Sequence, residues 1–189
     1  MSMRKLPKYK IQVVVTKNGK TIEKREVKSR TWVYNFIRML YGLFGSSKGT
    51  DNVITLTNTN GYDAGFPNMD SVDLAVGSVL APAGNAYYGI LVGSGASPAY
   101  DPSKHALDSP IDPAQMEPSE TSIAISAENV ITISRSFTNK SGSDLTVTEV
   151  GLVMYWQGDY FMIAYDVISG GVTVPDGATL TLKYTISLS

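Results

Sequence analysis

Residues 144–156, DLTVTEVGLVMYW, form a long apolar run that contains one charged side chain in its middle. The length of the run and its β-branched and aromatic residues predict one continuous β-strand. Side chains alternate along a strand, so the residues expected on one face are Val147, Glu149, Gly151 and Val153. A glutamate followed by a glycine is unfavourable inside such a strand. Either Glu149 lies exposed at a sheet edge, or a partner satisfies its carboxylate.

Further strand patterns lie on both sides of this run, separated by turn-forming stretches such as NKSGSD (139–144), QGD (157–159) and PDG (175–177). Residues 178–188 alternate regularly between apolar and polar side chains, as expected of a strand with one buried face. The predicted strands are 10–16, 21–28, 53–57, 87–92, 122–127, 130–137, 145–156, 160–167 and 178–188. This succession predicts a mainly β protein, an antiparallel β-sandwich of jelly-roll-like type.

One helix is predicted near the N-terminus, over residues 30–44. Ser29 is a suitable N-cap and Gly45 a suitable C-terminal stop. The residues that recur at helical spacing are Trp32, Val33, Phe36, Ile37, Leu40, Tyr41 and Phe44. The opposite face lacks the many lysines of a membrane-surface helix. We therefore expect a core helix, with Trp32 and Phe36 buried against the sheet.

The first 28 residues are expected to form a basic β-hairpin. Asn18-Gly19 is a strong two-residue turn signal between strands 10–16 and 21–28. The second strand is heavily charged and poor in β-formers, so the hairpin is expected at a sheet edge or projecting as an arm. The chain is thus divided into a basic β-hairpin arm, 1–28, and a β-sandwich domain, 29–189.

Charge is distributed unevenly along the 189 residues. Residues 1–30 carry ten Lys or Arg against two Glu, a net +8, whereas residues 51–189 carry four against fifteen acids, a net −11. The basic end could contact nucleic acid or anionic lipid, or meet the acidic end of a neighbouring subunit, or be only solvated. The residues expected to mediate assembly are Lys8, Lys10, Lys17, Lys20, Lys24 and Arg25.

The composition limits the chemistry that the chain can perform. There is no cysteine and a single histidine, His105, so thiolate chemistry and His-based triads are excluded. GSGAS at 93–97 lacks the lysine and helix start of a phosphate loop, and Asn58, Asn60 and Asp63 lack a distal glutamate for calcium. A glycosidase pair would have to come from carboxylates that lie scattered in a loop. We expect no catalytic residue, no metal and no cofactor, and therefore no enzyme.

Membrane insertion and export are also not expected from the sequence. No apolar segment follows the basic residues 1–8, so no signal peptide is predicted. The longest apolar segment, 32–44, is too short to span a bilayer and contains Arg38.

Three segments resemble a known family when taken in order. They are ILVGSGASPAYDPSKHALDSPI (90–111), SRSFTNKSGSDLTVTEVGLVMYW (134–156) and FMIAYDVISGGVTVPDGATLTLKYTISL (161–188). The block 88–188 resembles that of small tailed-phage structural proteins and of the attachment domain of phage tail-collar fibres, where G-x-G precedes an E-[IVM]-G-L strand. SRTWVYNF (29–36) resembles the helix start of such proteins. Relatives carry Arg-Asp where this chain has Tyr165-Asp166, which leaves Arg135 as the alternative cation for Glu149.

The resemblance implies a virion structural protein, made in a host cytoplasm, that assembles in multiple copies as capsid decoration, neck, tail or fibre attachment. The partners expected are copies of itself and other virion proteins, not membrane or nucleic acid. The alternative is a carbohydrate-binding or host-adhesion module that binds a host-surface glycan through tyrosines and Trp156. Glu149, Gly151 and Arg135 are expected to form a structural joint, in which a cation or backbone donors satisfy the carboxylate and another segment passes closely over the glycine.

Overall fold

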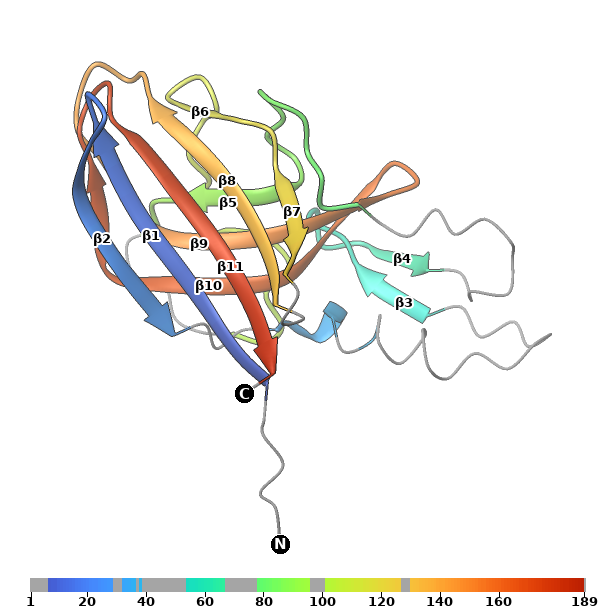
Figure 1. The fold of residues 1–189 in the computed structure, drawn as a ribbon. Coiled ribbons are helices and arrows are strands. Elements are labelled where there is room, and N and C mark those ends of the chain that lie inside the picture. Colours follow the sequence, from blue (N-terminus) through green and yellow to red (C-terminus); the bar gives the residue numbers. More distant parts are fainter. Residues whose placement is uncertain are drawn as a thin grey trace, which may run out of the picture.

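The computed structural model describes residues 7–28, 32–36, 38, 54–66, 78–95, 101–126 and 130–188 (Figure 1). These residues form eleven β-strands. The strands are β1 (Pro7–Lys17), β2 (Lys20–Lys28), β3 (Ile54–Thr57), β4 (Asp63–Phe66), β5 (Gly89–Gly93), β6 (Met116–Pro118), β7 (Ser122–Ile125), β8 (Ile131–Asn139), β9 (Leu145–Trp156), β10 (Asp159–Val174) and β11 (Thr179–Leu188).

Two antiparallel sheets form the body of the protein. Sheet A has the order β2-β1-β11-β8-β6, with β7 also paired to β8, and sheet B has the order β10-β9-β5. The strands of sheet B run across the back of sheet A, while the β3–β4 hairpin lies to one side (Figure 1). The prediction of a mainly β antiparallel sandwich with one short helix is therefore confirmed.

The main core lies between the two sheets. Sheet A contributes buried apolar side chains from its adjacent strands β1, β11 and β8. These are Ile11, Val13, Val15, Phe137, Leu180 and Leu182. Sheet B contributes Ile90, Val92, Val150, Leu152, Met154 and Phe161. Burial of these apolar side chains is the dominant favourable term for the fold.

A second apolar cluster lies apart from the main core. Its buried members are Val33, Val153, Met162 and Tyr165, and Leu107 packs against them. Segments 32–36 and 101–111 therefore form a third layer on sheet B. Because Val147 belongs to the main core, the prediction that it shares a face with Val153 was wrong; the pairing of β10 with β9 shifts register between Val167 and Val172, next to Val147.

The predicted helix is seen in part. Residues 34–36 and 38 are helical, and the other predicted helical residues from 39 to 44 lie outside the described residues. Trp32 and Phe36 stack with ring centroids 3.7 Å apart and pack against the main core. Both are half-buried, whereas Val33 between them is fully buried. Both aromatic residues therefore pack on the body of the protein as expected, although part of each side chain remains exposed.

The N-terminal hairpin is present, with positive φ at both Asn18 and Gly19 as predicted. It lies at an edge of sheet A and does not project as an arm, because β1 pairs with β11 over ten residues. The division of the chain at residue 28 therefore does not follow the sheet: Ile11, Val13 and Val15 have no exposed surface and belong to the main core.

This placement of β1 predicts unequal effects for two isoleucines of the hairpin. Ile11→Ala leaves a cavity in the core and should lower the free energy of unfolding by about 2–5 kcal/mol. Ile22→Ala changes a side chain that is 53% exposed and should stay within about 0.5 kcal/mol of the parent. Urea unfolding followed by circular dichroism measures both. A loss below about 1 kcal/mol for Ile11→Ala would mean that the hairpin is an independent arm after all.

Candidate functional site

Glu149 is a fully buried carboxylate in the middle strand of sheet B. β9 pairs with β10 on one side and β5 on the other, and Glu149 lies opposite Gly93 of β5. The side chain has no exposed surface. The explanation that places Glu149 at an exposed edge is therefore wrong, and its charge must be satisfied inside the protein.

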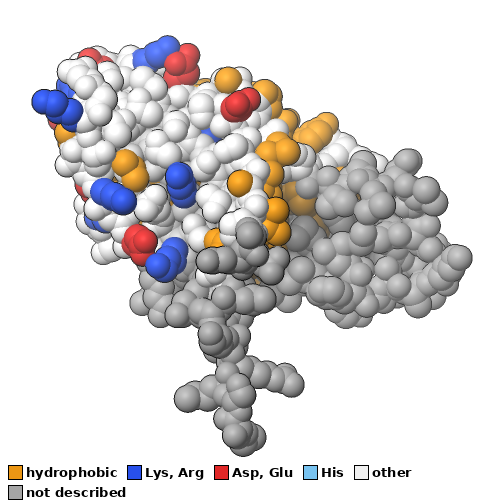
Figure 2. Space-filling model, viewed as in Figure 1, with side chains coloured by type: hydrophobic (Ala, Val, Ile, Leu, Met, Phe, Trp, Pro, Cys, Tyr) orange, Lys and Arg blue, Asp and Glu red, His pale blue; other side chains and the backbone are white. Residues whose placement is uncertain are grey.

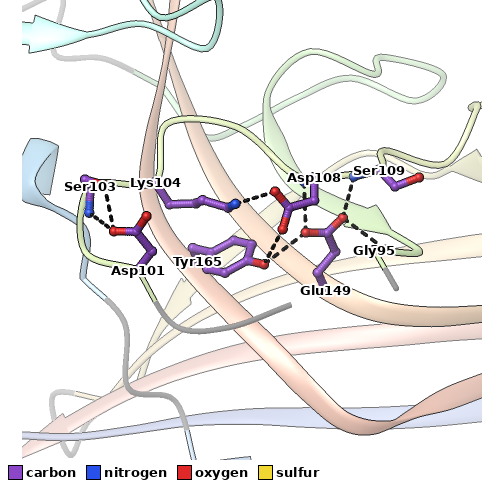
Figure 3. A network of polar contacts seen from close by, with 8 residues as sticks. All are labelled: Gly95, Asp101, Ser103, Lys104, Asp108, Ser109, Glu149 and Tyr165. Carbon is purple, nitrogen blue, oxygen red and sulfur yellow. Dashed lines mark hydrogen bonds and ion pairs between the residues drawn. The ribbon is translucent and has the colours of Figure 1, made fainter. Parts of the chain in front are cut away.

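Four donors satisfy this carboxylate (Figure 3). Oε1 accepts the backbone N–H groups of Ser109 at 2.8 Å and Gly95 at 3.3 Å. Oε2 accepts the N–H of Asp108 at 3.0 Å and the hydroxyl of Tyr165 at 3.1 Å. Three of the four are main-chain groups of the segment that covers sheet B. Hydrogen bonds of this kind stabilise the charged form of a carboxylate without a cation.

The glycines of the G-x-G stretch make room for the carboxylate. A Cβ on Gly93 would lie 2.4 Å from Glu149 Oε1 and 2.7 Å from the Ser109 carbonyl oxygen. A Cβ on Gly95 would lie 3.1 Å from the same Oε1. This loop surrounds an anion, but the anion is the carboxylate of the chain itself.

Gly151 lies under a closely approaching segment. A Cβ there would lie 2.7 Å from Met162 Cε and 3.2 Å from Leu107 Cδ2. Met162 is on the neighbouring strand β10, and Leu107 is on the segment that passes over the sheet. The expectation that another segment passes closely over Gly151 is therefore confirmed.

Tyr165, on the adjacent strand β10, supplies a hydroxyl donor to Glu149. Burial, and then the negative charge of Glu149, raise the pKa of Tyr165 above its ordinary value, so the phenol stays protonated. Lys104 lies over the Tyr165 ring, 5.4 Å from its centroid, and pairs with Asp108. Lys104 thus contacts Tyr165 and Asp108, which in turn donate hydrogen bonds to the Glu149 carboxylate.

The proposed pairing of Arg135 with Glu149 is wrong. Arg135 is 1% exposed, and its guanidinium donates to five backbone carbonyl oxygens. The acceptors are Ser119 at 2.9 Å, Tyr88 at 3.1 Å, Ile90 at 2.9 Å, Asn85 at 2.6 Å and Pro82 at 3.3 Å. Burial lowers the pKa of Arg135 to about 10, so it keeps its charge at neutral pH. Arg135 joins β8 of sheet A to segment 82–90, which leads into β5 of sheet B.

A third buried polar side chain, Asn139, holds the turn after β8 and was not identified from the sequence. Its Nδ2 donates to the carbonyls of Ser143 and Val174, both at 2.7 Å, and its Oδ1 accepts the Ser141 N–H at 3.0 Å. The FTNxSG pattern was the available signal, because an asparagine that opens a turn often bonds to the backbone around it. Glu149, Arg135 and Asn139 each bind mainly main-chain groups.

The residues expected to mediate assembly have different environments. Lys10 pairs with Glu26 at 2.9 Å within the hairpin. Arg25 contacts Glu23 at 3.2 Å and donates to the carbonyls of Ser169 and Gly171. Lys17, Lys20 and Lys24 are exposed, and the side chain of Lys8 lies outside the described residues. The three exposed lysines are available to a partner.

Four tyrosines form a surface that we call the tyrosine surface: Tyr87, Tyr88, Tyr155 and Tyr160. Neighbouring ring centroids lie 5.3–6.1 Å apart. Tyr87 is 64% and Tyr155 37% exposed. Burial is the main cause that raises the pKa of Tyr160, and electrostatic interaction with the other three tyrosines raises it further. Trp156, expected with them, packs against the main core.

The other stretches considered as ligand sites have local roles. Asn58 Oδ1 accepts the N–H groups of Asn60 at 3.0 Å and Tyr62 at 2.9 Å, which closes a turn. Within the described part of the chain, no three His, Asp or Glu side chains are grouped to hold a metal ion. No helix among the described residues is long and apolar enough to cross a bilayer.

The donor arrangement around Glu149 makes its charge necessary. In Glu149→Gln, one carboxylate oxygen becomes an NH₂ group, so at least one N–H donor loses its acceptor. The free energy of unfolding should fall by about 1–3 kcal/mol. The matched control is Glu117→Gln, at a side chain 53% exposed in a surface pair with Lys140, which should change by about 0–1 kcal/mol. Equal denaturation midpoints for the two variants would contradict the role of this carboxylate.

The two close glycines should respond differently to an added methyl group. Gly93→Ala directs a methyl at a buried oxygen and a backbone carbonyl, and should cost about 1–3 kcal/mol. Gly151→Ala meets the end of the flexible Met162 side chain, which can move, so its cost should be smaller. Thermal melts of both variants test the order. A less stable Gly151→Ala would show that the loop around Glu149 adapts more readily than the Met162 side chain.

Comparisons of the chain with protein-family models, with curated proteins and with solved structures find no match. The functional inference therefore depends on the residues of the chain and on their geometry.

Proposed function

We propose that this chain is a structural subunit that assembles in several copies in a virus particle. The resemblance of residues 88–188 to phage structural proteins supports the virion as its place, whether as capsid decoration, neck, tail or fibre attachment. The observation that supports assembly is that, among the described strands, the two ends of sheet A differ in chemistry.

The first edge is β2, which is basic. Among the described strands, β2 pairs with β1 alone. Its exposed lysines, Lys20 and Lys24, follow Lys17 of the hairpin turn. Lys and Arg side chains also extend over the adjoining face of sheet A, on the left in Figure 2. Charge on an edge strand discourages pairing with an identical edge, but it permits pairing with an edge of opposite charge.

The opposite edge is formed by β6 and β7. All four residues of β7 are exposed, and Ile123 and Ile125 are 50% and 70% exposed. β7 has neither charge nor proline, the usual protections of an edge strand. Hydrophobic side chains extend along this side of the described surface in Figure 2. Residues 105–134, which contain both strands, include five Asp or Glu and no Lys or Arg.

These features favour a second copy of the chain as the partner. The basic β2 edge of one copy would lie against the β6–β7 edge of the next and extend sheet A from subunit to subunit. Opposite charges would orient the encounter, and the exposed isoleucines would contribute apolar burial. The contact is heterologous, so it repeats around a ring or along a filament.

A charge-swap experiment tests the contact. Lys20→Glu/Lys24→Glu should reduce self-association of the full chain in light scattering, since like charges would then face each other. Glu117→Lys/Glu120→Lys should do the same from the other edge. A mixture of the two variants should associate again, because the complementary edges are restored across the mixed contact. High salt should weaken association of the parent, since the Debye length falls to about 3 Å at 1 M.

A parent chain that stays monomeric at every concentration would refute the proposed contact. So would association of the parent that neither pair of charge reversals weakens. A regular particle or ring containing this chain, seen by electron microscopy of its native source, is the expected result for the virion assignment. Its absence from particles would refute that assignment without affecting the edge contact.

The tyrosine surface favours a second candidate function, the binding of a carbohydrate on the host surface. Aromatic rings that are partly exposed and have polar tips suit the apolar face and the hydroxyl groups of a sugar. An exposed patch of this type often marks a binding site. A glycan array with the full chain separates the two candidates, because a purely structural subunit binds no sugar.

A further inference from the structure

A cavity of about 180 Å³ opens between the helical residues and the covering segment of sheet B. One side is formed by Tyr34, Asn35 and Arg38, another by Thr57 of β3, and the third by the loop 102–105. The lining residues are Tyr34, Asn35, Arg38, Thr57, Pro102, Ser103, Lys104 and His105. The cavity is separate from the two sheet edges and from the tyrosine surface.

The lining of this cavity is basic. Arg38, Lys104 and the single histidine of the chain, His105, all contribute to it, and the lining residues that the structure describes include no carboxylate. This composition contrasts with the surrounding sequence, since residues 51–189 carry a net charge of −11. Three nitrogen-bearing side chains around one small cavity provide several donors to a single oxyanion.

The carboxylates close to the cavity already have partners. Asp101 accepts the Ser103 N–H at 2.8 Å and the Ser103 hydroxyl at 2.6 Å, and these bonds lower its pKa. Asp63 accepts the Thr57 hydroxyl at 3.1 Å. Asp108 pairs with Lys104 and points toward the Tyr165 hydroxyl (Figure 3). Lys104 is thus held in position, with further N–H donors beyond the one that contacts Asp108.

The walls of the cavity are fixed by hydrogen bonds, one of which uses a basic group, since Arg38 Nη1 donates to the Thr55 carbonyl of β3 at 3.3 Å. The Asn35 amide donates to the carbonyls of Thr57 at 2.7 Å and Met162 at 3.2 Å, and accepts the Thr57 N–H at 3.0 Å. The Tyr34 N–H donates to the Pro102 carbonyl at 2.8 Å. The helical residues, β3 and the loop are therefore tied together, and a ligand would meet a largely preformed site.

We propose that this cavity binds a small oxyanion, either a phosphate or a carboxylate group. The guanidinium of Arg38, the ammonium of Lys104 and the imidazole of His105 are the groups that would contact it. This inference is independent of the assembly proposed above, because it involves neither edge of sheet A.

The single histidine gives a direct measurement. In ¹H NMR of the full chain, the imidazole Cε1 proton of His105 is the only one of its kind. Inorganic phosphate, added at constant pH and constant ionic strength, should shift this signal and saturate, whereas sodium chloride in its place should not. Acetate in a parallel titration distinguishes a carboxylate from a phosphate preference. Phosphate should also raise the melting temperature relative to chloride, as expected of a ligand that binds the folded state.

Three variants make the test specific. Lys104→Gln and Arg38→Gln should each weaken phosphate binding by about tenfold or more, the loss expected for one charge-assisted hydrogen bond. Lys140→Gln, at an exposed lysine that pairs with Glu117, should leave the titration unchanged. Because Lys104 also pairs with Asp108, Arg38→Gln decides the result if Lys104→Gln unfolds. The proposal is overturned if phosphate, acetate and chloride all give the same shift, or if neither cavity variant changes the titration.

Discussion

The burial of the Glu149 carboxylate is the constraint on which the outer layer of the protein depends. An ionised group in this position is tolerated only if its oxygens are fully hydrogen-bonded. The covering segment supplies N–H groups from Gly95, Asp108 and Ser109, so it must lie where those groups can reach the carboxylate. The carboxylate can therefore be buried only when the covering segment is in place. Leu107 and the Lys104–Asp108 pair take their positions from it.

Much of the fold could be predicted from local pattern. Regular alternation identified β11, the long apolar run identified β9, and Asn18-Gly19 identified the hairpin. The short strands β4 and β6 were missed, because three or four residues in a polar segment carry no periodicity. The role of the hairpin was also missed. Its charged strand resembled a free arm, and only the pairing of β1 with β11, far away in the sequence, makes it part of the core.

The environment of Glu149 could be predicted in part. A charge in an apolar strand implied that a cation or backbone donors satisfy it, but the sequence did not identify which backbone groups these are, and the cation named for it, Arg135, binds carbonyl groups elsewhere. The donors are mostly main-chain N–H groups, which every loop possesses and which only the fold can position. Tyr165 was not predicted as a donor, because its position opposite Gly151 depends on the pairing of β10 with β9.

The carbonyl acceptors of Arg135 have a consequence for how this protein can change in evolution. Segment 82–90 is held through backbone oxygens, whereas Gly95, Asp108 and Ser109 are held through backbone N–H groups. These hydrogen bonds involve backbone atoms, so they do not depend on which side chain the bonded residue carries. Gly93 and Gly95 are exceptions, because a side chain there would meet Glu149. The exposed side chains of these described residues can therefore change while the path of the chain is kept, whereas Ile90 and Leu107 are held in the two apolar clusters. The sandwich can serve as a constant frame for an outer surface that adapts to new partners.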